Sequence, residues 1–124
     1  MTATRYCVLL ADDDAALRRL VSATLGSNDF ELLHAMDGEE ALRVASEKHP
    51  ALVLLDVNMP RMDGFDVCRQ LKTDPSTNDI KIVMLTARGA DADRQRARDA
   101  GADDYFVKPF SPVQLLNRVY ALLG

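Results

Sequence analysis

Cysteine is scarce in this chain, with only Cys7 and Cys68 among its 124 residues. Cys7 opens an apolar segment and Cys68 lies in a helical pattern, so we expect two buried free thiols rather than a disulfide. Free thiols suit a reducing cytosol. The sequence also shows no signal-peptide core and no apolar run long enough to cross a bilayer, which predicts a cytoplasmic protein with no membrane partner.

An excess of positive charge is also lacking, since the formal net charge is −4. This charge argues against direct binding of nucleic acid or of anionic membranes by this domain. Apolar residues form 48% of the chain and charged residues 27%, which is ordinary for a soluble globular protein. The length suits a single domain over residues 1–124, whose core needs neither a disulfide nor a structural metal to fold.

Short apolar runs alternate with helical patterns along the whole chain. Continuous apolar runs are typical of strands that are buried on both faces of a parallel sheet. We expect strands over residues 7–11, 30–34, 51–55, 80–86 and 104–107. We expect helices over residues 15–25, 37–47, 65–72, 90–100 and 112–123. This alternation predicts an α/β fold with helices on both faces of a parallel sheet, although the pattern alone does not fix the strand order.

Polar side chains follow four of the five predicted strands. Asp12 and Asp13 follow the first strand, Asp56 the third, Thr86 ends the fourth and Lys108 follows the fifth. Ligands of such sheets bind beyond the carboxyl ends of the strands. If these four strands are neighbours, the five side chains meet in one pocket.

The chemistry of that pocket favours a phosphoryl group. Three adjacent carboxylates raise one another's pKa values, and a divalent cation relieves the repulsion. Ligands that offer only oxygen favour a hard ion such as Mg²⁺. Lys108 adds a positive charge and Thr86 a hydroxyl donor. The residues therefore suggest that Asp56 takes a phosphoryl group as an acyl phosphate, with the help of Mg²⁺.

Four segments of the chain carry a family resemblance: VLLADDD at 8–14, LLDVNMPRMDG at 54–64, MLTA at 84–87 and GADDYFVKPFSP at 101–112. In this order the chain resembles, over essentially its whole length, the receiver domain of response regulators in two-component systems. The resemblance implies a flavodoxin-like (βα)5 doubly wound sheet with strand order 2-1-3-4-5. It also implies a phosphorylation-dependent signalling switch that catalyses only its own phosphoryl transfer and dephosphorylation.

The same resemblance implies roles for the acidic residues. Asp56 would be the phosphoacceptor, and the donor would be a sensor histidine kinase or a phosphotransfer protein. Asp13, Asp56 and the backbone carbonyl of Asn58 would ligate Mg²⁺, with Asp12 acting through water. Taken singly, Asp12 and Asp13 could instead be helix N-caps and Asn58 a turn residue, and we expect Asp14 to be a cap.

Three further residues would respond to the phosphoryl group, again by resemblance. Lys108 would pair with it, Thr86 would swing toward it and Tyr105 would move inward behind it. The Lys108–Pro109 peptide bond would be cis. Taken singly, Thr86 reads as a strand-end hydroxyl, Lys108 as a surface lysine and Tyr105 as half-buried core, and only their joint placement favours the site.

The predicted helix at 90–100 is unusual, because it contains no apolar side chain larger than alanine. We therefore expect it to be loosely held, to be the most mobile element and to shift on activation. Within the apolar face of the last helix, Leu115 and Leu122 either complete the core or form part of a partner surface.

The face over residues 90–124 is the expected output surface. From Leu85 to Leu123 the chain most resembles receivers of winged-helix transcription regulators, which dimerise through their fourth helix, fifth strand and fifth helix. Arg94, Asp104 and Arg118 fall at charged positions of that face, whereas Gln114 and Tyr120 depart from its pattern. We expect this face to bind an output protein or a second copy of the chain.

Two other functions stay open at this point. A haloacid-dehalogenase-like aspartyl phosphatase would need a second aspartate where this chain has Asn58, and no cap domain is recognisable. Turnover of a phosphomonoester would support that alternative. An unphosphorylated scaffold receiver would bind its partners equally well after Asp56→Asn. The sequence identifies neither the kinase nor the output partner, and the chain could be a stand-alone regulator or part of a longer protein.

Overall fold

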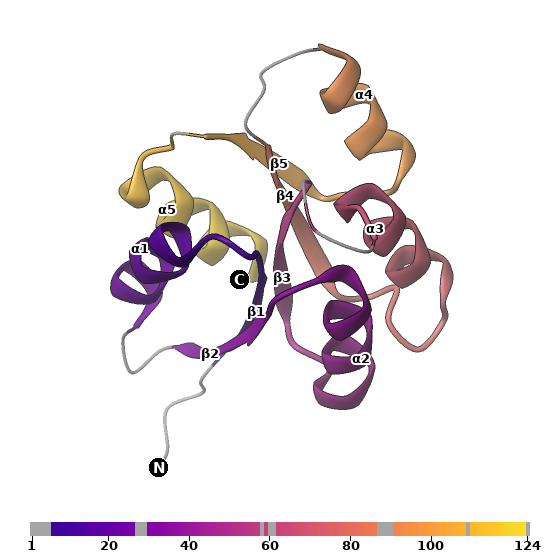
Figure 1. The fold of residues 1–124 in the computed structure, drawn as a ribbon, viewed down its shortest axis with the longest axis horizontal. Coiled ribbons are helices and arrows are strands. Elements are labelled where there is room, and N and C mark those ends of the chain that lie inside the picture. The colour runs from indigo at the N-terminus through magenta and orange to yellow at the C-terminus, as the bar shows by residue number, and fades with distance from the viewer. Residues whose placement is uncertain are drawn as a thin grey trace.

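The computed structural model describes residues 6–26, 30–57, 59, 62–86, 91–108 and 110–123. Five strands form one parallel sheet in the order β2-β1-β3-β4-β5 (Figure 1). The strands are β1 (Tyr6–Ala11), β2 (Phe30–Ala35), β3 (Leu52–Asp56), β4 (Lys81–Thr86) and β5 (Asp104–Val107). The helices are α1 (Ala15–Leu25), α2 (Gly38–Lys48), α3 (Gly64–Thr73), α4 (Asp91–Asp99) and α5 (Pro112–Leu123). The predicted flavodoxin-like fold and its strand order are confirmed.

The helices cover the sheet in two unequal layers (Figure 1). On one face α1 and α5 pack over the side chains of Leu52 and Leu54. On the other face α2, α3 and α4 pack over Val53 and Leu55. Successive residues of β3 therefore serve opposite cores, which is why this strand reads as a continuous apolar run.

Side-chain caps begin several of the helices, among them Asp14, which the sequence predicts to be a cap. Asp14 accepts hydrogen bonds from the backbone N–H groups of Ala16 and Leu17 at the start of α1. Asp37 accepts one from Glu40 at the start of α2, and the Ser111 hydroxyl accepts one at 3.4 Å from the backbone of α5. These caps satisfy orphan N–H groups and fix the strand-to-helix turns. Within the described ranges, no helix is long and apolar enough to cross a membrane.

The two thiols differ in their exposure. Cys68 is buried, with its sulfur 3.5 Å from the carbonyl oxygen of Ala100, and burial raises its pKa to about 12. Cys7 is only half-buried, so the prediction that both thiols are buried is wrong for this residue. The first two residues of β1 are less covered than the four that follow them. Both cysteines are free, as predicted.

The last helix completes the core on its face of the sheet. Leu115 is fully buried, and Leu122 is half-buried against the same cluster as α1. This outcome favours the core role for both leucines over a partner surface. Val113 and Tyr120, by contrast, remain 65% and 40% exposed on α5.

Candidate functional site

The carboxyl ends of β1, β3, β4 and β5 meet at one edge of the sheet. Asp56 ends β3 and pairs in register with Leu85, one residue before Thr86. The Lys108 backbone N–H donates to the Thr86 carbonyl at 2.6 Å, which continues the β4–β5 pairing past the end of the strand. Because parallel strands end at the same edge of the sheet, the predicted side chains lie close together although helices separate them in the sequence.

Three carboxylates and one ammonium form the centre of the site. Carboxylate oxygens of Asp12, Asp13 and Asp56 all lie within 4.8 Å of one another. Asp12 and Asp56 are 1% and 4% exposed, whereas Asp13 is exposed. The Lys108 Nζ atom lies 3.3 Å from Asp56 Oδ1 and 3.5 Å from Asp12 Oδ2. The Lys108 ammonium therefore lies beside the two buried carboxylates, and the third, that of Asp13, lies at the exposed rim of the cluster.

Asp12 is buried in the cluster with one of its two carboxylate oxygens lacking a hydrogen bond from the described residues. Its Oδ1 accepts a 2.6 Å hydrogen bond from the Asp14 backbone N–H. Its Oδ2 is buried and has no hydrogen-bond partner among the described residues, although it lies 3.5 Å from the Lys108 ammonium in an ion pair. The pKa of Asp12 is raised to about 6, chiefly by burial and also by the charge of Asp56, while the Asp14 backbone N–H and the Lys108 ammonium oppose the rise.

These residues fit a divalent cation. A buried carboxylate oxygen without a hydrogen-bond donor would be satisfied by a metal ion or by its water shell. The donors of this cluster are all oxygens, and the third carboxylate at the rim leaves access from solvent. Hard oxygen ligands of this kind suit Mg²⁺, which keeps several of its waters.

Two predicted residues lie beyond the carboxylates and contact α4. Thr86 is buried, and its hydroxyl donates to Asp93 Oδ2 at 3.3 Å. Tyr105 is half-buried, and its hydroxyl accepts a 2.6 Å hydrogen bond from Arg94 Nε. Neither of these contacts with α4 was predicted from the sequence. The absence of large apolar side chains from residues 90–100 is the signal that polar side chains hold this helix.

Two predictions fall on residues without a description. The backbone carbonyl of Asn58 and the Lys108–Pro109 peptide bond both lie outside the described residues.

Gly64, at the start of α3, lies very close to the end of β3. A Cβ atom at Gly64 would lie 2.3 Å from the backbone oxygen of Asp56, and no side chain fits there.

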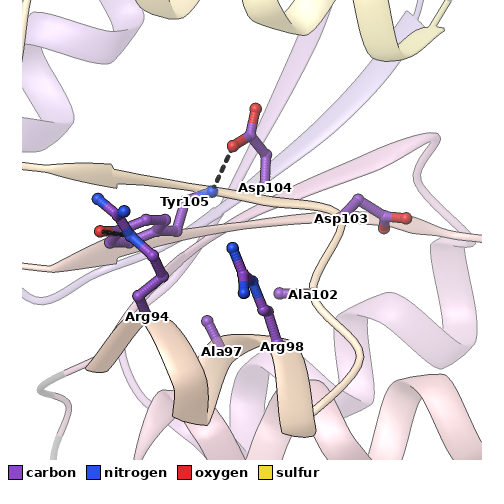
Figure 2. Close-up of a pocket in the computed structure, with 7 residues that line it drawn as sticks. All are labelled: Arg94, Ala97, Arg98, Ala102, Asp103, Asp104 and Tyr105. Atoms are coloured by element: carbon purple, nitrogen blue, oxygen red, sulfur yellow. Dashed lines mark hydrogen bonds between the residues drawn. The ribbon is translucent and has the colours of Figure 1, made fainter. Parts of the chain in front are cut away.

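Two hollows lie near these residues. The larger, of about 350 Å³, lies between α4 and β5 and contains Arg94, Arg98 and Tyr105 in its wall (Figure 2). The smaller, of about 220 Å³, lies between α1 and the segment after β5, where Leu20, Lys108 and Phe110 line it. Only the smaller hollow touches the carboxylate site, through Lys108.

Comparison with known proteins decides the family. The family model of the response regulator receiver domain matches residues 8–120. The chain is a member of the response regulator receiver family. This receiver domain is a phosphorylation-dependent switch of two-component signalling rather than a true enzyme, and the family implies a histidine kinase as its partner. The aspartyl phosphatase alternative is thereby excluded.

Individual relatives agree with this assignment. The receiver domain is 47% identical over 116 residues to the probable transcriptional regulator ycf27 of Cyanophora paradoxa, a match that covers 94% of this chain and 47% of the relative. It therefore spans about half the length of the curated relatives that it matches.

Solved structures share the fold and one holds a metal. A putative response regulator from Chloroflexus aurantiacus has a TM-score of 0.92 at 33% identity, covering 97% of this chain and 98% of that one. The receiver domain of sensor histidine kinase PA1611 from Pseudomonas aeruginosa has a TM-score of 0.89 at 26% identity, covering 98% and 99%. That structure has a magnesium ion coordinated in its active site cleft.

Proposed function

We propose that Asp56 accepts the phosphoryl group in this switch and that the donor is a phosphohistidine of a sensor kinase or phosphotransfer protein. The observation that carries this proposal is the ammonium of Lys108 shared between two buried carboxylates, Asp12 and Asp56, at the carboxyl edge of the sheet. Asp56 ends the central strand β3, which pairs with β1 as far as Leu55 and with β4 as far as Asp56 itself, so its position is closely fixed. A rigidly held nucleophile beside a cation suits phosphoryl transfer.

The step itself is a displacement at phosphorus. An Asp56 carboxylate oxygen forms a bond to phosphorus, the P–N bond of the phosphohistidine breaks, and its electron pair stays on the imidazole nitrogen. The Lys108 ammonium is close enough to stabilise the phosphoryl oxygens once they arrive. Mg²⁺ held by Asp12, Asp13 and Asp56, and by the Asn58 carbonyl, would neutralise the charge that the carboxylates and phosphoryl oxygens share.

The smaller hollow supports a docking position for the donor. It is lined by Ala16, Leu17 and Leu20 of α1 together with Lys108 and Phe110. Leu20 is 38% exposed, which is unusual for a large aliphatic side chain in this molecule. An apolar groove that ends at Lys108 would let a helical donor pack beside the site and present its phosphohistidine to Asp56.

The output surface that we propose is the face over residues 90–124. On it, Arg118 Nε lies 2.9 Å from Asp104 Oδ2, and Val113 and Tyr120 are exposed on α5. Phosphorylation would alter this face through Thr86 and Tyr105 and so control binding of an output protein or dimerisation. We also propose that residues 1–124 form one receiver domain, that it acts in the cytoplasm, and that it touches neither membranes nor nucleic acid directly.

Mass spectrometry of the intact protein tests the acceptor. The protein is incubated with Mg²⁺ and a small-molecule phosphodonor, beside an Asp56→Asn variant. We expect a gain of one phosphoryl group that is absent from the variant. Equal gain in both proteins would overturn Asp56 as the acceptor. Native spectra of the same samples report whether the gain is accompanied by a dimer.

A further inference from the structure

Helix α4 contacts both of the residues that are expected to respond to phosphorylation, and it does so through adjacent side chains. Asp93 Oδ2 accepts the hydroxyl of Thr86 at 3.3 Å. Arg94 donates from Nε to the hydroxyl of Tyr105 at 2.6 Å, and its guanidinium carbon lies 5.1 Å from the centre of the Tyr105 ring. Figure 2 shows Arg94 lying across that ring.

The contact with Asp93 competes directly with a phosphoryl group. A threonine hydroxyl has one proton to donate. Thr86 is buried at the end of β4, beside the strand that ends at Asp56, so a phosphoryl group on Asp56 would offer the same proton a charged acceptor. The hydroxyl cannot donate to the Asp93 carboxylate and to the phosphoryl oxygens at once.

The contact with Arg94 acts in the same direction. Tyr105 is half-buried, and Arg94 is itself exposed. The hydrogen bond and the cation–π contact both stabilise the present position of the ring. An inward movement of Tyr105 would have to give up both contacts with Arg94.

We propose that Asp93 and Arg94 are positioning residues that hold Thr86 and Tyr105 in the resting state and so set the energetic threshold for activation. This inference rests on the proposed roles of Thr86 and Tyr105 and adds the side chains that oppose them. The Asp93 and Arg94 contacts and the phosphorylation of Asp56 oppose each other. Because such coupling is reciprocal, the factor by which these contacts disfavour phosphorylation equals the factor by which phosphorylation disfavours the contacts. The helix that lacks large apolar anchors is thus restrained by contacts that the signal itself removes.

Beryllofluoride, which mimics a phosphoryl group on a carboxylate, gives a reversible readout. Its dissociation constant at fixed Mg²⁺ is measured by NMR titration for wild type, Asp56→Asn, Asp93→Ala and Asp99→Ala. Asp99 is the matched control, because it lies on the same helix and carries the same charge but bonds to Gln95 instead. We expect Asp93→Ala to bind about 3- to 10-fold more tightly than wild type, and Asp99→Ala to change the constant less than twofold.

A double-mutant cycle separates the hydrogen bond from the loss of a negative charge. The Asp93→Ala change is repeated in a Thr86→Val background, which keeps the shape of the side chain and removes the hydroxyl. If the hydroxyl carries the effect, Asp93→Ala gains nothing there. An equal gain in both backgrounds would mean simple electrostatics and would overturn the proposal. So would an unchanged constant in Asp93→Ala.

The second contact has its own pair of variants. Arg94→Ala removes both contacts with Tyr105, whereas Arg98→Ala removes the same charge from the same helix and the same hollow. We expect tighter beryllofluoride binding and a shifted Tyr105 ring signal in Arg94→Ala only. Equal behaviour of the two variants would overturn this part of the proposal. Thermal unfolding of each variant is measured beside it, since a merely structural role would lower the midpoint without tightening beryllofluoride binding.

Failure of the proposed function gives a different result. If beryllofluoride binds neither wild type nor Asp56→Asn, the phosphoacceptor assignment is wrong, and the inference falls with it. If wild type binds and Asp56→Asn does not, the assignment stands, and the variants of Asp93 and Arg94 alone decide the inference.

Discussion

The Nζ atom of Lys108 lies 3.3 Å from the carboxylate oxygen Oδ1 of Asp56, although the two residues are 52 positions apart, and β3, which Asp56 ends, and β5, which Lys108 follows, are not neighbours. The lysine side chain crosses over the end of β4 to reach β3. Its ammonium is largely covered, with 23% of the side chain exposed, so its interaction with the carboxylate is weakly screened by solvent.

This contact predicts a catalytic cost for loss of the lysine charge. Lys108→Met keeps the aliphatic length and removes the ammonium that would stabilise the phosphoryl oxygens. We expect the rate of phosphorylation of Asp56 by a small-molecule donor to fall at least tenfold. Lys108→Arg, which keeps the charge, serves as the control and should retain more of the rate. A Lys108→Met rate within twofold of wild type would contradict the proposed role.

A second prediction concerns Asp12 and pH. The pKa of this carboxyl is about 6 in the folded protein, against about 3.9 in an unfolded chain. Between these values the unfolded state loses its proton first, so the free energy of unfolding should fall as pH rises from about 4 to about 6. Asp12→Asn removes this cost, and we expect it to stabilise the protein at pH 7 without divalent ions by about 1–3 kcal/mol.

Denaturant titrations from pH 3.5 to 8, in the presence of a chelator, measure this effect. The gain in unfolding free energy from Asp12→Asn should vanish below pH 4, where the Asp12 carboxyl of the wild type is protonated in both the folded and the unfolded protein. Asp13→Asn is the control, because Asp13 is exposed in the same cluster and should change stability much less. Added Mg²⁺ should then stabilise wild type more than Asp12→Asn. A pH-independent gain would mean that the burial of the Asp12 charge is not its cause.

A third prediction tests the structural ion pair that lies away from the site. Asp103 Oδ2 accepts from the Ile82 backbone N–H at 2.8 Å and lies 2.8 Å from Lys72 Nζ, with both side chains mostly covered. Asp103→Ala leaves the Ile82 N–H without this acceptor, and we expect a loss of about 1–3 kcal/mol in urea unfolding.

The exposed pair of Asp66 and Arg69 provides the comparison. Arg69→Ala should change the free energy of unfolding by less than about 1 kcal/mol, because water screens this pair. Phosphorylation of Asp56 should be unaffected by Asp103→Ala once the protein is folded. Similar losses in the two variants would mean that the hydrogen bond to Ile82 contributes little.

Much of the fold could be predicted because its signals are local. The strands β1, β3 and β4 are short, mostly apolar runs, and Asp14 is the predicted cap of the helix that follows it. The site could be predicted because parallel strands place their carboxyl ends together, so that polar residues after separate strands share one edge. The strand order was predicted from the family resemblance, because an apolar run does not indicate which strands lie beside it in the sheet.

The parts that escaped prediction depend on tertiary packing. The half-exposure of Cys7 reflects how far the helices extend over the first residues of β1. The hydrogen bond from Thr86 to Asp93 joins the end of β4 to α4, and no periodicity in the sequence relates these two residues. Likewise, the guanidinium of Arg96 lies 4.1 Å from the ring centre of the buried Phe65, a contact that a pattern of charges cannot reveal.

The composition of α4 leads to the last prediction. Among residues 92–99 of the helix, whose burial is described, only Ala97 is buried, and Ala100 after the helix is buried too. The hollow beside β5 lies where larger side chains would pack. The sequence predicted a loosely held helix, and arginine contacts to Tyr105 and Phe65 are a weaker restraint than a buried leucine.

We therefore expect the amides of α4 to exchange with deuterium at least tenfold faster than those in the middle of α1. Helix α1 is the control because Leu17, Val21 and Leu25 anchor it. Exchange in α4 as slow as in α1 would mean that the arginines hold the helix as firmly as a leucine core, and beryllofluoride should then leave that exchange unchanged.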